Sequence, residues 1–258
     1  MPPDPPSAPT GRAALGRVGF ETGSDAYERA RPGYPVEAVT HLEATTGITR
    51  GSRVLDLAAG TGKLTRQLLA DGALCLALEP SASMREVFRR VVPGVALAGG
   101  TAEMVPVATG TVDAVVVAQA FHWFDPSRAL PEMARVLRPG GWLSLIWNER
   151  DESDPMVAEL TRLSRWDRCQ PYPVGKDFGA DIQRSRLFGP VQRSTFSFIQ
   201  QLDLTAFVEQ VASRSYVQVL PEHEREALLA SVREFGAALG RPIELPYVTD
   251  LFCAQVPG

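Results

Sequence analysis

The chain has 258 residues, enough for one large α/β domain or for a core domain with a modest appended cap. Its composition, 45% hydrophobic and 22% charged, is ordinary for a globular protein. There are 26 Lys and Arg against 30 Asp and Glu, which gives a net charge of -4 and a pI near 5.5. Proteins that bind nucleic acids usually have a basic face or a pI above about 9. The slightly acidic charge balance therefore disfavours RNA or DNA as the main substrate, and we expect no nucleic-acid partner.

The cysteines and the first residues point to a reducing compartment. Cys75, Cys169 and Cys253 are too widely spaced for a disulfide framework or a zinc site, so no metal is expected. Residues 1–16 are rich in proline and lack the apolar core of a signal peptide, and we predict a disordered tail there. No stretch approaches the length of an apolar membrane span. The expected location is the cytoplasm, with no membrane partner.

Short apolar segments alternate with helical patterns between residues 35 and 147. The predicted strands are 53–57, 73–79, 95–98, 112–118 and 142–147, and the valines of 112–118 indicate burial on both faces. Helices are predicted after Pro35 and Gly62. A capping box of Ser83 with Glu86 predicts a third helix, and an N-cap at Asp125 before Pro126 predicts a fourth. This alternation predicts a doubly wound, mostly parallel α/β sheet.

The pattern changes beyond Asn148. A helix is predicted after Asp154, then a loop-like stretch to about Gly189, then a strand over 191–199. Two helical patterns lie between 204 and 235, and a closing strand is predicted over 243–253. We interpret 17–150 as a ligand-binding core and 151–258 as late sheet strands plus an inserted helical cap over the substrate site.

A glycine turn from Asp56 to Gly62 links the first strand to the next helix. Such a turn lets a ligand approach the backbone, and the helix start attracts an anion. A P-loop is excluded because Leu occupies positions 57 and 64, and Thr65 is too large for a dinucleotide fingerprint. The acidic residues Asp56 and Glu79, at the ends of consecutive strands, favour a methyltransferase turn that binds S-adenosylmethionine. The alternative is that the glycines only shape the turn.

The chain from about Phe20 to Ala254 resembles class I S-adenosylmethionine-dependent methyltransferases of the type 11 group, in the branch resembling trans-aconitate methyltransferase. The segments that carry the resemblance are Tyr27 with 31–35, 54–62, 100–103, 119–124 and 213–216. The glycine motif is specific to the superfamily, and the His-Trp-Phe block of 122–124 to the narrower branch. One departure is Ala58, which stands where the family usually has the first of three glycines.

The resemblance implies that residues 17–150 bind S-adenosylmethionine through specific side chains. Glu79 would accept hydrogen bonds from both ribose hydroxyls, and Gln119 would lie beside the sulfonium. The methionine end would be held by Asp56, Ala58, Gly60 and Gly62. The adenine would be flanked by Pro80 and Met84 and met at its amino group by Ala102 and Glu103. The cofactor would be covered by Tyr27 and Arg31, ahead of the first helix.

Methyl transfer is an in-line displacement from a reactive sulfonium, so alignment and exclusion of water can supply much of the catalysis. A general base is needed only for an alcohol or phenol acceptor. His122, after the fourth strand at the carboxyl edge of the sheet, is the candidate base, since its pKa suits proton transfer near neutral pH. The alternative is that His122 only packs in the wall of the site.

Three further residues are candidates for contact with the substrate. Trp123 could face the sulfonium through a cation–π contact, or could belong to the core. Arg214 and Tyr216 could meet an acidic substrate, or could form a salt bridge and a packed ring. We predict a methyltransferase that acts on a small molecule with a carboxylate or hydroxyl acceptor. The alternatives are an RNA or protein methyltransferase and a cofactor-binding regulatory protein without turnover. The sequence does not predict an oligomeric state.

Overall fold

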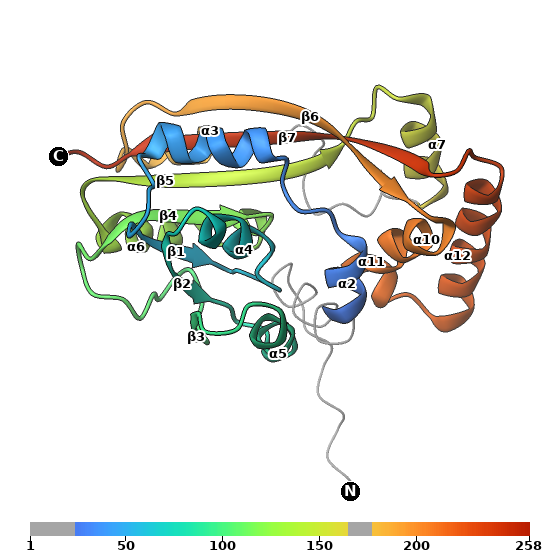
Figure 1. The fold of residues 1–258 in the computed structure, drawn as a ribbon, viewed down its shortest axis with the longest axis horizontal. Helices are drawn as coiled ribbons and strands as arrows, with labels where there is room; N and C mark the ends of the chain where they lie inside the picture. The colour runs from blue at the N-terminus through green and yellow to red at the C-terminus, as the bar shows by residue number, and fades with distance from the viewer. Residues whose placement is uncertain (1–23, 165–176) are drawn as a thin grey trace, which may run out of the picture.

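The computed structural model describes residues 24–164 and 177–258, which form one seven-stranded sheet with helices on both faces (Figure 1). The predicted tail of residues 1–16 and Cys169 lie outside the described residues. The order of the strands in the sheet is β3-β2-β1-β4-β5-β7-β6. Their bounds are Arg53–Leu57 (β1), Leu74–Leu78 (β2), Ala96–Ala98 (β3), Val112–Ala118 (β4), Leu137–Arg150 (β5), Gln192–Leu202 (β6) and Ile243–Gln255 (β7). The predicted doubly wound sheet is confirmed.

Strands β1 to β5 are parallel to one another, and β7 runs antiparallel between β5 and β6. From β1 the chain moves outward through β2 to β3, and then returns to the other side of β1 as β4. The strand order therefore reverses between β1 and β4. In open α/β sheets the crevice at the carboxyl ends of the strands at such a reversal binds ligands. The topology places the carboxyl ends of β1, β2, β4 and β5 at one edge of the sheet.

One face of the sheet is covered by α3 (Val36–Thr46) and α4 (Lys63–Ala70), with α5 (Ala82–Val91) beside β2. Each helix has an apolar face that is buried, which includes Val39 and Leu42 in α3 and Leu64 and Leu68 in α4. These side chains pack on strand residues such as Val116. The burial of an apolar stripe, rather than helical propensity alone, stabilises such short helices.

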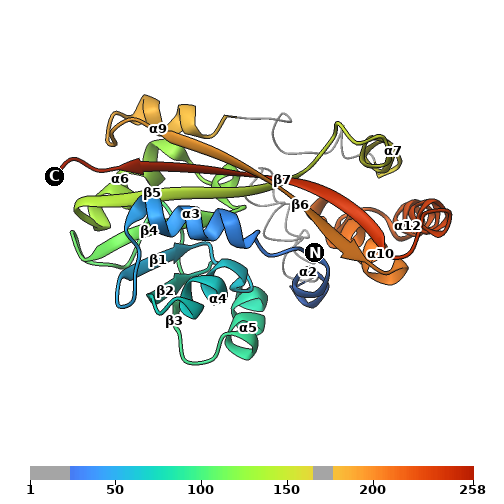
Figure 2. The same cartoon turned by 45° about the horizontal axis from the view of Figure 1, so that its top comes forward.

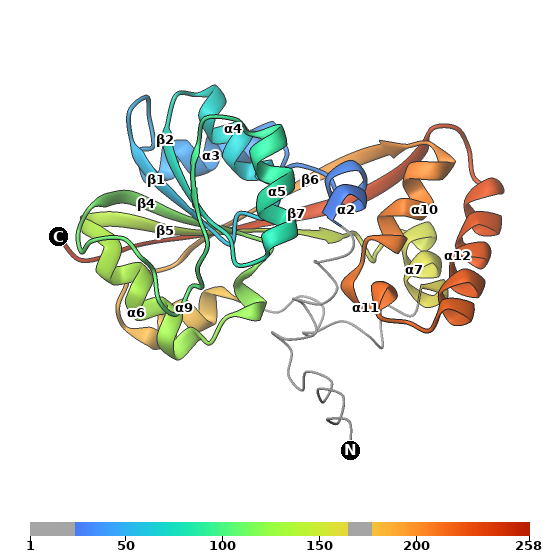
Figure 3. The same ribbon diagram turned by 90° about the horizontal axis from the view of Figure 1, so that it is seen from below.

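The opposite face is covered by α6 (Pro126–Val136) and α9 (Gly179–Ser185), as Figures 2 and 3 show. Asp125 caps α6 by accepting a hydrogen bond from the backbone N–H of Ser127, and Pro126 occupies the first helical position, as predicted. Between β4 and α6 the chain makes one short 3-10 helix, η1 (Phe121–Trp123).

The long ends of β6 and β7 extend beyond the parallel strands and carry a second group of helices (Figure 1). This group comprises α7 (Pro155–Leu163), α10 (Leu204–Ala212), α11 (Ser215–Gln218) and α12 (Glu222–Ala237). Its core includes Leu160, Phe207 and Val232, which pack against Leu245 and Tyr247 of β7. Helix α2 (Ser24–Ala30) lies between this group and α5. In the described parts of the chain, no helix has the length and apolar character needed to cross a bilayer.

Several predicted details were wrong. The N-cap of α5 is Ser81, whose Oγ accepts the Met84 N–H at 3.3 Å; Ser83 lies inside the first turn, so no Ser83–Glu86 capping box forms. Strand β5 runs from Leu137 to Arg150 rather than from Trp142 to Trp147, and β7 pairs with it from Trp142 to Arg150. Helices α2, α9 and α11 were not predicted, since each is too short to show a clear period.

Candidate active site

Two adjoining cavities open at the carboxyl edge of the sheet, one of about 330 Å³ and one of about 140 Å³. We call them the larger and the smaller cavity. The larger lies against the ends of β1 and β2 and the 100–103 segment, and the smaller reaches the end of β5 and the start of α11. The two cavities share part of their lining, namely Tyr27, Ala58, Gly60, Ala118, Gln119 and Trp123. The shared residues mark the passage between the two spaces.

The larger cavity collects most of the residues predicted for adenosine. Met84 and Ala102 are almost fully buried and give it an apolar wall. Glu103 lines it as well and accepts the Asp125 N–H at 3.0 Å, which ties the 100–103 segment to the start of α6. Pro80, the second residue after β2, is exposed and also lines this cavity. Residues far apart in the sequence are thus brought to one apolar space with polar ends.

Glu79 lies at the base of the larger cavity and is only 5% exposed. Its two carboxylate oxygens accept one backbone N–H each, from Gly60 at 2.8 Å and from Ser81 at 2.7 Å. A carboxylate can accept about four hydrogen bonds, so each oxygen retains acceptor capacity toward the cavity. Burial raises the pKa of Glu79, and these two hydrogen bonds oppose that shift. The contact with Gly60 also ties the end of β2 to the glycine turn.

The glycine turn adopts left-handed backbone at three positions. The φ angles are 59° at Ala58, 58° at Gly60 and 84° at Gly62. A Cβ at Gly62 would come within 2.6 Å of Val92 and 2.7 Å of Phe88, whereas a Cβ at Gly60 would meet nothing within 4 Å. Gly62 therefore lets α4 approach α5, and lines neither cavity. Ala58 adopts the conformation that glycine would take at lower cost.

Asp56 lies beneath this turn, fully buried, and lines neither cavity. Its Oδ2 accepts a hydrogen bond of 2.5 Å from Thr65 Oγ1, and its Oδ1 has no hydrogen-bond partner among the described residues. Burial raises the pKa of Asp56 to about 7, and the hydrogen bond from Thr65 opposes the shift. Asp56 thus links the end of β1 to α4, and it titrates near neutral pH.

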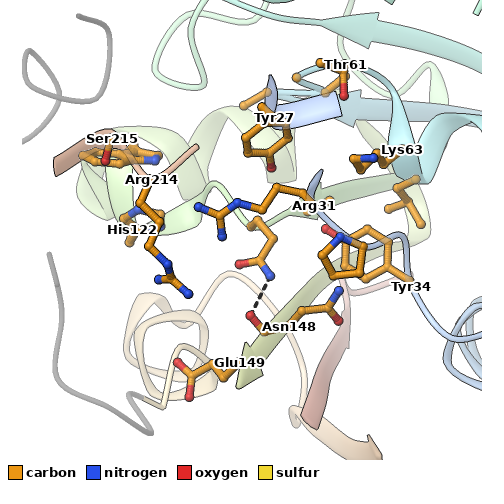
Figure 4. Close-up of a pocket in the computed structure, with 18 of the residues that line it drawn as sticks. Tyr27, Arg31, Tyr34, Thr61, Lys63, His122, Asn148, Glu149, Arg214 and Ser215 are labelled. Carbon is orange, nitrogen blue, oxygen red and sulfur yellow. Dashed lines mark hydrogen bonds between the residues drawn. The ribbon is translucent and has the colours of Figure 1, made fainter. Parts of the chain in front are cut away.

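The smaller cavity is rich in basic side chains. Arg31, Lys63, Arg150 and Arg214 line it, together with the acidic Glu149 and Glu152. Figure 4 shows the side chains of Arg31 and Arg214 reaching into the same space, with Glu149 at another side of it. Lys63 has a carboxylate neighbour, Glu28 of α2, at 3.4 Å. Because Glu28 offsets the charge of Lys63, the three arginines provide most of the positive charge near this cavity.

Gln119 and His122 follow β4, Gln119 at the passage between the cavities and His122 in the wall of the smaller one. Gln119 has a φ of 59°, a strained value for a non-glycine residue of the kind that clusters at functional sites. Its Nε2 donates to the Asn148 carbonyl oxygen at 2.7 Å, the dashed line of Figure 4. His122, in η1, lines the smaller cavity with its ring 4.3 Å from Trp123 and 5.1 Å from Trp147, centre to centre.

Helix α2 connects the two halves of the site. Tyr27 lines both cavities, and Glu28 is paired with Arg66 of α4 at 2.7 Å. On the other side Arg29 pairs with Glu209 at 3.2 Å, and Arg31 Nε donates to Ser213 Oγ at 3.0 Å. Tyr27 therefore lies in α2, and Arg31 follows directly after that helix.

The structure separates one predicted pair and adds residues that were not predicted. Arg214 lines the smaller cavity, but Tyr216 lines neither; its hydroxyl donates to the Ser164 carbonyl oxygen at 2.6 Å. Arg150 and Asn148 were not predicted as site residues. Their place at the carboxyl end of an apolar strand was the signal that could have found them, because that edge of a parallel sheet binds ligands.

The glycine turn, the acidic residue after β2 and the strand order are features of one family, and comparisons with known proteins agree. Residues 55–145 match the family model described as "Methyltransferase domain". An uncharacterized methyltransferase of Mycobacterium tuberculosis is 41% identical, over 90% of this chain and 93% of that protein. The chain belongs to the S-adenosylmethionine-dependent methyltransferases. The narrower trans-aconitate branch stays a prediction.

Other relatives share the family and the fold. A methyltransferase-like protein of Schizosaccharomyces pombe is 32% identical, over 92% of this chain and 94% of that protein. Among solved structures, phosphoethanolamine N-methyltransferase 2 of Haemonchus contortus in complex with S-adenosyl-L-methionine superposes with a TM-score of 0.57 at 16% identity. That match covers 99% of this chain and 62% of that one. At this identity the likeness shows the class I methyltransferase fold alone.

Proposed function

We propose that this methyltransferase binds S-adenosylmethionine in the larger cavity and methylates a small molecule that occupies the smaller one, at a carboxylate or hydroxyl oxygen. The proposal depends on one observation, that two cavities of different character meet at Gln119 and Trp123. The larger cavity has three carboxylates, Glu79, Glu103 and Asp125, against Arg128, and the smaller one has the three arginines and Lys63 against Glu149 and Glu152. A cationic donor and an acidic acceptor are matched by this division of charge. In this scheme residues 17–150 are the cofactor-binding core and 151–258 provide the cap.

The residues of the larger cavity fit an adenosyl group. Glu79 retains acceptor capacity toward the cavity for the ribose hydroxyls, and Met84 and Ala102 provide apolar contact for a flat base. Glu103 and Pro80 also line this cavity, and the turn at Ala58 and Gly60 exposes backbone groups where the methionine end would lie. Asp56 and Gly62 would support this turn from below, through Thr65 and through α5, rather than touch the cofactor.

When bound, S-adenosylmethionine supplies a methyl group that forms a bond to the acceptor oxygen while the sulfur keeps the electron pair of the broken bond. The chain then has to align the acceptor and exclude water, for which Tyr27 and Arg31 of the α2 segment are placed. A carboxylate acceptor has no proton to lose. A hydroxyl acceptor does, and His122, at the wall of the smaller cavity, is the residue placed to take it.

The size of the smaller cavity favours a small molecule over RNA or a protein as the acceptor. The sequence's net charge of -4 also disfavours a nucleic acid. A regulatory protein without turnover remains the alternative from a different class, and product formation separates it from an enzyme. Assays that detect S-adenosylhomocysteine with candidate hydroxy acids, dicarboxylates and bulk tRNA test these alternatives together.

The cofactor site is tested by Glu79→Ala. We expect it to weaken binding of S-adenosylmethionine by about 1–3 kcal/mol, the scale for losing charge-assisted hydrogen bonds. Isothermal titration calorimetry measures the loss, with Glu86→Ala as the matched control, because Glu86 is exposed and lines neither cavity. Equal affinities of the two variants would remove Glu79 from the ribose site and with it the proposed position of the cofactor.

A further inference from the structure

Strand β6 forms one edge of the sheet, and β3 forms the other. The two edges differ in length, because β3 has three residues whereas β6 has eleven. Figure 1 shows β6 along the border of the sheet, beside β7. Among the described residues, the backbone of β6 is hydrogen-bonded to β7 alone. In an antiparallel pair alternate residues direct their N–H and C=O groups away from the partner, so about half of the residues of β6 offer these groups to a further strand.

Natural proteins usually protect such an edge, and β6 lacks the common protections. Short strands, prolines, bulges and lysines prevent another chain from pairing with an edge, and β3 is protected by its shortness. Strand β6 contains no proline, no lysine and no acidic residue, and it pairs with β7 residue for residue over its whole length. Its one charged side chain, Arg193, is already bound to Asp250 of β7 at 3.0 Å. An unprotected edge of this length indicates that the strand has a partner in the native protein.

The two faces of β6 have different surroundings. Between residues 194 and 201 the even-numbered side chains are half-buried and the odd-numbered ones are exposed. On the half-buried face, the ring of Phe196 lies 5.5 Å from that of His41 on α3, and Phe198 stacks on Tyr247 of β7 at 5.2 Å. On the other face Ile199 is 56% exposed. Helix α3 therefore packs on a face of β6 and not along the edge that carries the backbone groups.

The sequence of β6 is complementary to itself. When two copies pair antiparallel with Ser197 opposite Ser197, Phe196 of each copy faces Phe198 of the other, and Thr195 faces Ile199. Aromatic pairs and pairs of β-branched residues stabilise neighbouring strands. The single charged residue of each strand faces an uncharged one, so no like charges oppose each other in this register. Both faces of the paired strands thus gain favourable contacts.

We propose that two copies of this chain associate antiparallel through β6, about a two-fold axis at Ser197, so that their seven-stranded sheets become one continuous sheet. A second copy is the partner that the strand itself specifies, because its own sequence supplies every opposing residue. Two-fold dimers are also the commonest homo-oligomers. The association leaves the candidate active site open, since no residue of β6 lines either cavity.

Substitutions at Ser197 test the proposed axis, because this exposed side chain faces its own copy there. We expect Ser197→Lys and Ser197→Glu each to weaken self-association about fivefold or more, since like charges then face each other. An equimolar mixture of the two variants should regain at least the wild-type affinity through a heterodimer in which lysine faces glutamate. Sedimentation equilibrium measures the dissociation constants. The matched control is Ser231→Lys, at an exposed serine of α12, which should associate as the wild type does.

Hydrogen exchange of the 192–202 segment gives a second measurement without any substitution. The outward amides of β6 should exchange more slowly as the protein concentration rises through the dissociation constant, whereas amides of β3 should not change. This result decides the matter even if circular dichroism shows a Ser197 variant to be unfolded. Wild-type protein that remains monomeric up to about 100 µM overturns the inference. A dimer that folded Ser197 variants leave unchanged does so as well, because the copies then associate through another surface.

Discussion

The larger and the smaller cavity are built from different parts of the chain and by different means. The larger one depends on backbone shape, with left-handed residues at 58, 60 and 62 and a glutamate that accepts two backbone N–H groups. The smaller one depends on long charged side chains at the end of β5, just after α2 and just before α11. Gln210 of α10 and Ser213 at its end contact two of them, Arg150 and Arg31. The first design suits a ligand common to a whole family. The second can change its ligand by changing a few side chains, since function depends on the site rather than on the fold.

Both halves also bury an ionisable side chain, acidic in one and basic in the other. Asp56 lies under the glycine turn, and Arg150 lies at the end of β5 against Gln210 of α10. The two differ in what is near them, since Asp56 lines neither cavity while Arg150 lines the smaller one. We therefore expect changes at Asp56 to alter mainly the stability of the core, and changes at Arg150 to alter mainly the binding of the acceptor. Three predictions, from the largest expected effect to the smallest, test this division of roles.

Asp56→Asn should change how stability depends on pH. The pKa of Asp56 is raised from 3.8 to about 7 in the folded protein, so the folded state holds a proton that the unfolded state releases. The contribution of Asp56 to stability is therefore greatest below about pH 4 and is lost as the pH rises to about 7. Asparagine lacks this titration and can still accept the bond from Thr65. The free energy of unfolding of wild type minus that of the variant should fall by a few kcal/mol over this range, since each pKa unit is worth about 1.4 kcal/mol.

Urea denaturation of both proteins across that pH range measures the difference, and the subtraction removes the effects of all other titrating groups. A difference that stays constant with pH would mean that Asp56 is ionised in the fold as it is in water. The binding of the acceptor in the smaller cavity should be the same in both proteins. A change there would show that the two halves are less independent than their structure indicates.

Gly62→Ala and Gly60→Ala form a matched pair within one turn. At Gly62 a methyl group adds left-handed strain to a clash with Val92 and Phe88, and we expect a loss of about 2–4 kcal/mol of stability. At Gly60 only the strain applies, and we expect about 1 kcal/mol. Cofactor affinity should show the reverse order, because Gly60 lines both cavities and Gly62 lines neither. Thermal unfolding and calorimetry with S-adenosylmethionine measure the two effects, and equal destabilisation would contradict the packing argument.

His122→Ala distinguishes a base from a wall residue. With a hydroxyl acceptor, loss of the base should slow turnover by around 10²-fold, about 2.7 kcal/mol in activation free energy. With a carboxylate acceptor the loss should stay below about tenfold, because no proton has to leave. Turnover numbers for both acceptor types with the same variant give the answer. A loss below about tenfold for both would leave His122 as part of the wall, packed between Trp123 and Trp147.

The core half was largely predictable because its signals are local. Strand-helix alternation, the turn from Asp56 to Gly62 and the N-cap at Asp125 each depend on neighbouring residues, and the structure has them as predicted. At Ala58 the departure from glycine was visible in the sequence, but only the structure shows that this alanine adopts a left-handed backbone conformation, with a φ of 59°. The predicted capping box was wrong because Ser81 and Ser83, two residues apart, can both serve as the N-cap, and the structure uses Ser81.

What the sequence by itself determined is the fold class, which follows from periodicity, and the family, which follows from the motifs that carry the resemblance. The resemblance, rather than periodicity, also named most residues of the larger cavity. Only the tertiary structure decided the smaller cavity. Arg150 meets Gln210 across 60 residues, and Arg31 meets Ser213 across 182. No local pattern marks such pairs, because the free energy that brings them together comes from the packing of whole elements, β5 on β7 and α2 on α10.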